Sequence, residues 1–440
     1  MGAASANVPA IQLVTGPMLT GSHRGQVVGA CTDCRRFWAA YRADDIDADE
    51  IQDVNAQLVP GVGTCSVMGT ASTMALIAEA LGMALPGSAT APAVSAERRR
   101  IAEATGARAV ALAGAGTRPG DIVDRRAIEN ALRVLLSIGG STNGIVHLTA
   151  IAGRLGIRID LEAVDRMARE TPVLVNLKPS GSHYMEDLHA AGGLPRILSE
   201  IRDLLHLDVP TVGGALLGDT LGSVPDWPQD VVRERAAPVY PEGGLAVLKG
   251  NLAPSGAVIK QSAASPSLMV HEGRAVVFTG LEDLANRLDD PDLEVSADDI
   301  LVLQNIGPKG APGMPEAGLI PIPRKLARAG VKDMVRISDG RMSGTAAGTI
   351  VLHVSPESAA GGTLGLVRSG DRIRLDVANR RLDVLLGASE LAARRADLPA
   401  HLAEPSRGYR RLYLDEVLQA ENGADFAFCQ PEMLVTAPSS

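Results

Sequence analysis

One cysteine lies in a run of glycines and small hydroxyl residues. Cys65 follows Gly-Val-Gly-Thr and precedes a predicted helix that begins near Ser72. Glycine-rich turns and helix N-termini present unpaired N–H groups, which stabilise a thiolate or an anionic cluster. The spacing is not that of the dinucleotide-binding fingerprint, because the third glycine is Gly69. Free cysteines are often buried, so an inert thiol is the alternative, and spacing alone favours it.

Two further cysteines, Cys31 and Cys34, form a Cys-Thr-Asp-Cys motif. A zinc site would need two more ligands, and no second motif of this kind follows. A redox role would require the motif to open a helix of a thioredoxin-like unit. The motif therefore favours a structural or incidental pair over a zinc or redox module. Cys429, near the end of the chain, is expected to be inert.

A single carboxylate, Glu316, lies in a segment dominated by glycine and proline, residues 305–318. Magnesium is bound in many sites by one or two carboxylates together with substrate and water. Glu316 is therefore a candidate magnesium ligand. The alternative is a solvated loop glutamate, which is the commoner environment of this residue type.

A serine lies on a predicted tight turn after a strand, in the segment 336–348. Ser343 stands between Met342 and Gly344. A hydroxyl on such a turn can act as nucleophile or base if its surroundings lower its pKa. The segment lacks the G-x-S-x-G spacing of hydrolases, and a serine that caps the next element is the alternative.

The composition limits the class of protein that carries these groups. A chain of 440 residues is too long for one ordinary core, so two or three domains are expected. A net charge of −9 argues against nucleic acid as a partner. No stretch reaches the ~18 apolar residues that span a bilayer, and the N-terminus lacks the pattern of a secretory signal. Four cysteines do not form a disulfide framework, so a cytoplasmic protein without membrane partners is expected.

The first half predicts strands alternating with helices, and hence an α/β layer domain over residues 1–240. Short apolar runs predict strands at 11–16 and 108–114. Apolar residues at helical spacing predict helices in the segments 72–82, 126–140, 141–156, 160–172 and 192–205.

The second half, residues 241–440, predicts a β-rich domain shaped as a barrel or a curved sheet. Residues 371–386 alternate apolar and charged side chains, and Asn379 and Arg380 are expected to form the turn of a hairpin. The tail after Cys429 is expected to be loose. Further apolar runs predict strands at 275–280, 300–308, 333–338 and 349–356.

Long segments spread over nearly the whole chain resemble one family, the iron–sulfur dihydroxy-acid and sugar-acid dehydratases. This family includes phosphogluconate, arabinonate and xylonate dehydratases. Cys-Thr-Asp-Cys-Arg-Arg-Phe-Trp and Gly-Met-Pro-Glu-Ala-Gly resemble the sugar-acid branch. The matching segments are GPMLTGSHRGQ, GTCSVMGTASTM, SIGGSTNGIVHLTAIA, YMEDLHAAGGLP, GGLAVLKGNLAPSGAVIK, GAPGMPEAG and ISDGRMSGTAAGT.

The resemblance implies an N-terminal α/β domain that carries cluster and metal and a C-terminal barrel-like domain that closes over them. It implies a [2Fe–2S] or [4Fe–4S] cluster on three cysteines, with one iron free to act as a Lewis acid on the leaving hydroxyl. The third of these cysteines matches Cys65. Glu316 matches a ligand of Mg²⁺, which binds the carboxylate and 2-hydroxyl of the substrate. Ser343 matches the serine that takes the C2 proton as an alkoxide.

The resemblance also implies the reaction and the assembly. A 2,3-dihydroxy carboxylic acid, either a sugar acid such as a pentonate or 2,3-dihydroxyisovalerate, would lose water and yield a 2-keto-3-deoxy acid. The enzyme would be a cytoplasmic homo-oligomer, a dimer or a tetramer.

The chain departs from the family chiefly in its N-terminal part. The family's first two cluster cysteines, two acidic magnesium ligands and a modified lysine lie before the segment that matches residues 6–14, and Cys31 and Cys34 follow that segment. The chain is therefore expected to be a member without its N-terminal part. A non-catalytic family member, acting as an oligomer partner or a remnant, is the alternative, and a zinc or redox module at Cys31 and Cys34 is a third hypothesis.

Overall fold

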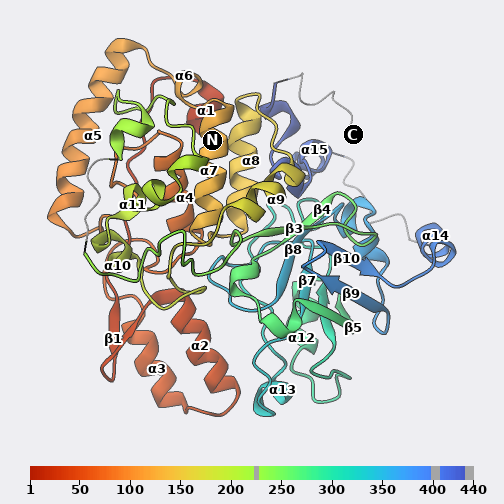
Figure 1. Cartoon of the computed structure of the whole chain (residues 1–440). Helices are drawn as coiled ribbons and strands as arrows, with labels where there is room; N and C mark the ends of the chain where they lie inside the picture. Colours follow the sequence, from red (N-terminus) through yellow and green to blue (C-terminus); the bar gives the residue numbers. More distant parts are fainter. Residues whose placement is uncertain (222–226, 398–406, 432–440) are drawn as a thin grey trace.

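The computed structural model describes residues 1–221, 227–397 and 407–431. Helices dominate its first half, and an antiparallel hairpin of β1 (Gly21–His23) and β2 (Gln26–Val28) accompanies them (Figure 1). The helices of this half are α1 (Gly2–Ala6), α2 (Ala30–Arg42), α3 (Ala48–Gln57), α4 (Thr70–Ala80), α5 (Ala96–Ala115), α6 (Pro119–Ile122), α7 (Arg125–Ser137), α8 (Asn143–Arg154), α9 (Leu161–Glu170), α10 (Met185–Ala190) and α11 (Gly193–Glu200).

An eight-stranded mixed sheet forms the second half, in the order β10-β9-β5-β6-β7-β8-β4-β3. The two edges nearly meet, because Lys249, next to β3, bridges to Arg381 of β10. The sheet is therefore barrel-like, and α9 packs against β3 where it meets the helices. The strands are β3 (Ala246–Leu248), β4 (Gly256–Ile259), β5 (Val270–Phe278), β6 (Ile300–Leu303), β7 (Arg336–Ser338), β8 (Ile350–Ser355), β9 (Arg372–Asp376) and β10 (Arg381–Val384). The remaining helices are α12 (Leu281–Arg287), α13 (Arg324–Arg328), α14 (Ala388–Ala396) and α15 (Tyr409–Glu416).

The expected fold class, α/β with a barrel-like C-terminal half, is confirmed, because helices and a nearly closed eight-stranded sheet are both present. The five predicted helices correspond to α4, α7, α8, α9 and α11, and the strands predicted in the second half correspond to β5 to β10. The hairpin turn is also confirmed: β9 and β10 pair antiparallel, and Arg380 adopts φ +56° in their turn. The C-terminal tail from residue 432 onward lies outside the described residues.

Two strand predictions are wrong. Residues 108–114 belong to α5, an alanine-rich helix capped by Ser95, whose side chain accepts a hydrogen bond from the N–H of Arg98. Alanine strongly favours a helix, and a short apolar run does not reveal its own period. Residues 11–16 form no strand, and only Gln12 makes an isolated bridge, to Ala84.

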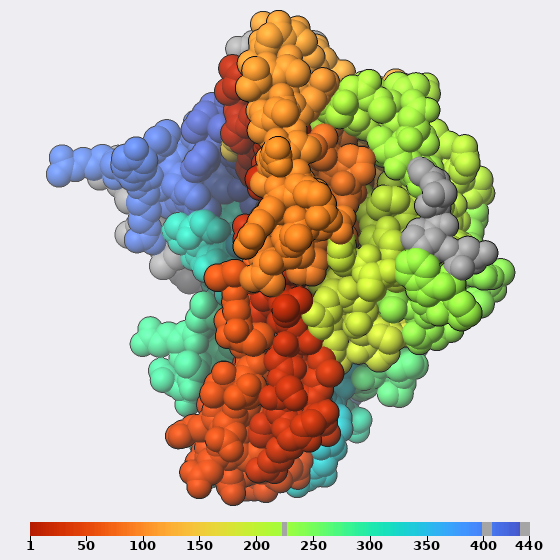
Figure 2. All heavy atoms as spheres, turned by 90° about the vertical axis from the view of Figure 1, so that its left-hand side faces the viewer, coloured from red at the N-terminus to blue at the C-terminus, as the bar shows by residue number. Residues whose placement is uncertain are grey.

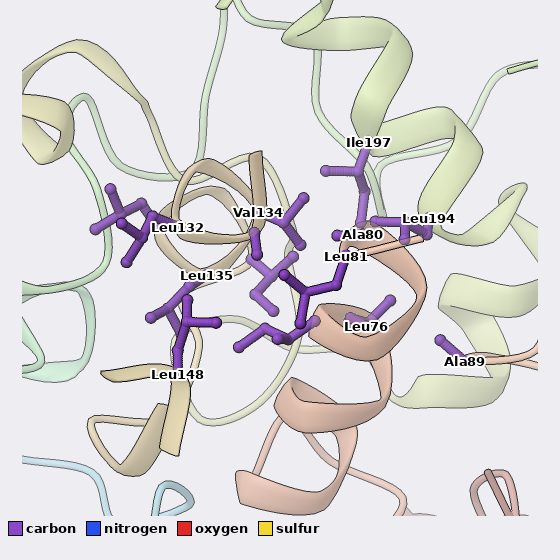
Figure 3. Packing of buried hydrophobic residues seen from close by; sticks show 14 of the residues in the cluster. Leu76, Ala80, Leu81, Ala89, Leu132, Val134, Leu135, Leu148, Leu194 and Ile197 are labelled. Atoms are coloured by element: carbon purple, nitrogen blue, oxygen red, sulfur yellow. The ribbon is translucent and has the colours of Figure 1, made fainter. Parts of the chain in front are cut away.

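The core of the helical half forms where α4 crosses α7. Val134 and Leu135 of α7 lie nearer than Leu132 to Leu76 and Ala80 of α4, and Leu148 of α8 lies beside Leu135 (Figure 3). These side chains are at most 4 % exposed. The burial of each leucine among them contributes about 1.5–3 kcal/mol to the free energy of folding. This packing fixes the first turns of α4 and α8, which both contribute residues to the site described below.

A small lobe, residues 21–58, projects from the helical half (Figures 1 and 2). It contains β1, β2, α2 and α3 around its own apolar cluster, which is Val28, Phe37, Ile51, Val54 and Leu58. Arg42 at the end of α2 binds both carboxylate oxygens of Asp289 at 2.7 Å, which ties the lobe to the sheet half. Among the helices of the described ranges, none has the length and hydropathy to span a membrane.

Candidate active site

Ser343 lies on the turn between β7 and β8 and is half-buried. Its Oγ is 2.8 Å from the hydroxyl oxygen of Thr345, and the N–H of Thr345 points to the same Oγ at 3.4 Å. The backbone N–H of Ser343 donates to the carbonyl of Gly318 at 2.9 Å. The serine hydroxyl is thus held by its own turn and by the loop that carries Glu316.

The centre of this turn, Gly344, has no room for a side chain. A Cβ at this position would lie 2.4 Å from Oγ of Ser141 and 3.1 Å from its Cα. On its carbonyl oxygen, Gly344 accepts a hydrogen bond from Nζ of Lys260 at 3.1 Å. The turn is therefore clamped between Ser141, which precedes α8, and Lys260, which follows β4.

Glu316 lies beside the serine turn on the long loop after β6. It forms an isolated parallel bridge with Arg341, and its Oε2 accepts a hydrogen bond from Nδ2 of Asn143 at 2.9 Å. Asn143 begins α8, is fully buried and also donates to Oγ1 of Thr70 at 3.0 Å. One amide thus connects the first turns of α8 and α4 with the carboxylate of Glu316.

Two buried carboxylates hold the loop that carries Glu316. Asp339 accepts hydrogen bonds from the N–H groups of Asn305 and Ile306 at 3.2 and 3.1 Å. Glu357 accepts from the N–H groups of Lys309 and Gly310 at 2.8 to 2.9 Å. Burial raises the pKa of both carboxyl groups, and these hydrogen bonds partly offset the increase.

Cys65 is half-buried and lies beside Cys31, the first cysteine of the Cys-Thr-Asp-Cys motif. A hydrogen bond from the Cys31 thiol, together with the N–H of Val67, lowers the pKa of Cys65 against the opposing effect of burial. The same hydrogen bond raises the pKa of Cys31, which is also within hydrogen-bonding reach of the Thr345 hydroxyl. Burial raises the pKa of Cys34.

The motif opens α2, and Asp33 between its cysteines anchors that helix. Asp33 is 1 % exposed and accepts from the N–H of Gly29 at 2.8 Å, from Nζ of Lys178 at 2.9 Å and from the hydroxyl of Tyr184 at 2.8 Å. Although burial opposes its charge, these donors keep the pKa of Asp33 below its usual value. Arg35, two residues further along the helix, donates to Oγ1 of Thr345 at 3.4 Å. The first turn of α2 therefore lies against the serine turn.

The structure brings the three predicted residues around one turn. Ser343 contacts Thr345, Thr345 contacts Cys31 and Cys31 contacts Cys65, while Glu316 lies beside Arg341 of the same segment.

Sequence reasoning missed four residues that complete this arrangement. The Cys-Thr-Asp-Cys spacing predicts a structural or incidental pair for Cys31, and the structure adds a contact of Cys31 with Cys65. Thr345 follows the predicted serine at a distance of two residues. Asn143 could have been suspected as a polar residue at the start of an otherwise apolar helix, and Lys260 as a charge that ends an apolar strand.

The donor set does not by itself fit the metal groups that the resemblance implies. In residues 1–221, 227–397 and 407–431, no three His, Cys, Asp or Glu side chains lie close enough together to hold a metal ion. Cys65 could supply one thiolate and Glu316 one carboxylate. An iron–sulfur cluster or a protein-bound magnesium ion would need further ligands.

Comparison with known proteins gives the class. The family model for the N-terminal part of dihydroxy-acid/6-phosphogluconate dehydratases matches residues 1–220, and the model for the C-terminal part matches residues 230–424. The chain belongs to the dihydroxy-acid/6-phosphogluconate dehydratase family, and it is accordingly an enzyme of the hydro-lyase class.

Individual relatives come from both branches of this family. The chain is 46 % identical to L-arabinonate dehydratase of Rhizobium leguminosarum over 430 residues, which cover 97 % of the chain and 74 % of the relative. It is 44 % identical to 6-deoxy-6-sulfo-D-gluconate dehydratase of Pseudomonas putida over 442 residues, which cover 100 % of the chain and 76 % of the relative. It is 42 % identical to dihydroxy-acid dehydratase of Syntrophotalea carbinolica over 426 residues, which cover 96 % of the chain and 76 % of the relative.

Proposed function

We propose that the chain dehydrates a 2,3-dihydroxy carboxylic acid, either a sugar acid such as a pentonate or 2,3-dihydroxyisovalerate. The observation that carries the proposal is the meeting of Ser343, Glu316 and Cys65 around one turn. The relatives named after sugar acids and dihydroxy acids support this substrate class.

In the proposed reaction, the oxygen of Ser343 takes the proton from C2. The C2–H electron pair then forms the C2–C3 double bond, and the C3 hydroxyl leaves as water after it gains a proton. The enol so formed tautomerises to the 2-keto-3-deoxy acid. A serine hydroxyl is a weak base in water, so its surroundings must stabilise the alkoxide.

The proposal keeps an iron–sulfur cluster, of the [2Fe–2S] or [4Fe–4S] type, and Mg²⁺ as cofactors. Cys65 would hold the cluster and Glu316 the magnesium ion, in each case together with ligands that the described residues do not supply. We place the cluster- and metal-binding domain at residues 1–240 and the domain that carries the catalytic serine at residues 241–440. A cytoplasmic homo-oligomer, a dimer or a tetramer, is part of the same proposal.

The test is a substrate panel under anaerobic conditions with iron, sulfide and Mg²⁺. The chain is assayed alone and mixed with a polypeptide that covers the roughly one quarter of the relatives' length outside the match, and 2-keto acid is trapped as its semicarbazone. Product from a pentonate, a hexonate or 2,3-dihydroxyisovalerate supports the proposal. A folded chain that yields no product from any of these acids in either mixture contradicts it and favours the non-catalytic alternative.

A further inference from the structure

One buried lysine contacts the serine turn and takes no part in the proposed chemistry. Lys260 follows β4 and is 6 % exposed. Its hydrogen bond goes to the carbonyl oxygen of Gly344 at 3.1 Å, and no ion pair is found for it among the described residues. A buried amine without a counter-charge is unfavourable, so a packing role alone does not account for it.

The charged groups on the neighbouring segments are engaged with one another. Glu242 lies near the segment after β4, because it accepts a hydrogen bond from the side chain of Gln261. Its carboxylate also accepts a hydrogen bond from Nη2 of Arg380 at 2.6 Å. Asp333 accepts from Ser265 at 2.7 Å and pairs with the buried Arg336. Neither carboxylate is paired with Lys260, so the carbonyl of Gly344 is the group that receives its hydrogen bond.

The Gly344 carbonyl and the Thr345 N–H belong to one peptide unit, and this N–H points to Ser343, the proposed base. The Gly344 oxygen accepts from Lys260, and the Thr345 N–H of the same peptide unit points to Oγ of Ser343 at 3.4 Å. Electrons are delocalised across the C–N bond of a peptide. A positive charge at the oxygen therefore makes the N–H a stronger donor, as hydrogen bonds in a chain polarise one another.

We propose that Lys260 is a positioning residue for Ser343, which fixes the Gly344–Thr345 peptide and transmits its charge through that peptide to the serine oxygen. The stronger N–H donor stabilises the alkoxide that accepts the C2 proton. This inference rests on the proposed function, because it assigns Lys260 a role in the same reaction.

The lysine is expected to change its charge near neutral pH. Burial lowers the pKa of Lys260 from 10.5 to about 7. The ammonium form therefore predominates below about pH 7, and rising pH removes the charge while the neutral amine can still donate a hydrogen bond. The alkoxide is stabilised most in the ammonium form, so turnover should decline as pH rises through this range.

The first experiment needs no turnover. Threonine residues are labelled with ¹⁵N, the Thr345 amide signal is assigned with a Thr345→Ser variant, and its chemical shift is followed from pH 5 to 9. We expect a titration midpoint near 7 in the unmodified chain and in Lys249→Met, since Lys249 is a partly exposed lysine paired with Glu162. The titration with a midpoint near 7 should be absent in Lys260→Met and Lys260→Gln, and any titration that the Cys65 thiol transmits through Cys31 should be the same in the unmodified chain and in all variants.

The second experiment measures turnover on whichever acid the substrate panel identifies. Lys260→Met should lower kcat about 10- to 100-fold, less than the 10²–10³-fold lost with a direct oxyanion donor, and leave KM within about twofold. The decline of kcat at alkaline pH should also disappear. Lys249→Met should behave as the unmodified chain.

The outcomes separate this inference from the proposed function. A Thr345 signal that does not titrate in the unmodified chain overturns the role of Lys260, even if no lysine variant folds. So does an unchanged kcat and pH profile in a folded Lys260→Met. An unmodified chain that turns over no acid contradicts the proposed function, while the amide titration still decides whether the lysine charge reaches the peptide.

Discussion

The side-chain amide of Asn143 lies 2.9 Å from the carboxylate of Glu316, although 173 residues separate them in the chain. The same amide nitrogen donates to Thr70 and to the carbonyl of Met342. This contact joins the helical half to the loop that carries the candidate metal ligand, and it sits next to the serine turn. The site thus depends on how the two halves of the chain meet.

Replacement of Asn143 by Ala should destabilise the chain and lower turnover. Glu316, Thr70 and the Met342 carbonyl would lose their shared donor in a buried place, at a cost of about 2–3 kcal/mol. Urea unfolding measures the change. The control is Asn55→Ala, at an exposed position of α3. Equal stability of the two variants would show that the amide does not join the halves.

Replacement of Asp33 by Asn should weaken the attachment of α2 to the site. At pH 7 the variant leaves the partly buried Lys178 without its counter-charge, so we expect a loss of about 2–4 kcal/mol. Because the pKa of Asp33 is lowered in the folded chain, its contribution is present above the unfolded pKa and is lost as pH falls through the folded pKa. The difference in unfolding free energy should therefore shrink toward acidic pH. Asp49→Asn, on the exposed face of α3, serves as control, and a loss that does not vary with pH would refute the ion pair.

Glu79 should make the chain less stable as pH rises. It is buried in α4 and accepts from the N–H groups of Gly87 and Ala89, and burial raises its pKa from 4.5 to about 7. Between these values the folded state binds more protons than the unfolded state, so unfolding free energy falls with rising pH, by up to about 3 kcal/mol. Chemical unfolding at a series of pH values should show this decline in the unmodified chain and in Glu282→Gln, at an exposed position. The decline should be missing in Glu79→Gln, and its persistence there would assign it to other groups.

Two glycine-to-alanine substitutions should act in opposite directions. Gly344→Ala places a methyl group against Ser141, so the serine turn must move. The variant should have lower turnover, and its free energy of unfolding should fall by about 1–3 kcal/mol. Gly106→Ala lies on the exposed face of α5 with open space around it and should stabilise the chain by about 0.5–1 kcal/mol. Thermal unfolding and turnover of both variants give the comparison. Full activity of Gly344→Ala would mean that the turn tolerates displacement.

Local features of the fold could be predicted because their signals are local. Asp160 and Asp124 cap α9 and α7 through neighbouring N–H groups, and the β9–β10 hairpin follows from alternation around Asn379 and Arg380. The prediction of a strand at 108–114 was wrong, because an alanine-rich run fits both the strand and the helix periodicity. The helix propensity of the whole of α5, of which this run is one part, favours the helix.

The candidate site could be predicted only in part. Ser343, Glu316 and Cys65 stand out by residue type within glycine-rich segments and through the resemblance of those segments to a family. The contacts of Lys260 with Gly344 and of Cys31 with Cys65 join residues that lie 84 and 34 positions apart. Such pairs arise from the packing of the sheet, the helices and the lobe, which no local pattern reveals.

The proton transfer by Ser343 is the central claim, and Ser343→Ala tests it most directly. Turnover of the substrate labelled with deuterium at C2 is measured for the unmodified chain, for Ser343→Ala and for Ser22→Ala, at an exposed position of the hairpin. We expect Ser343→Ala to fold normally and to lose turnover by roughly 10²–10⁴-fold, the range typical of a missing general base, while Ser22→Ala keeps both turnover and isotope effect. A folded Ser343→Ala that forms 2-keto acid at the unmodified rate would contradict the claim.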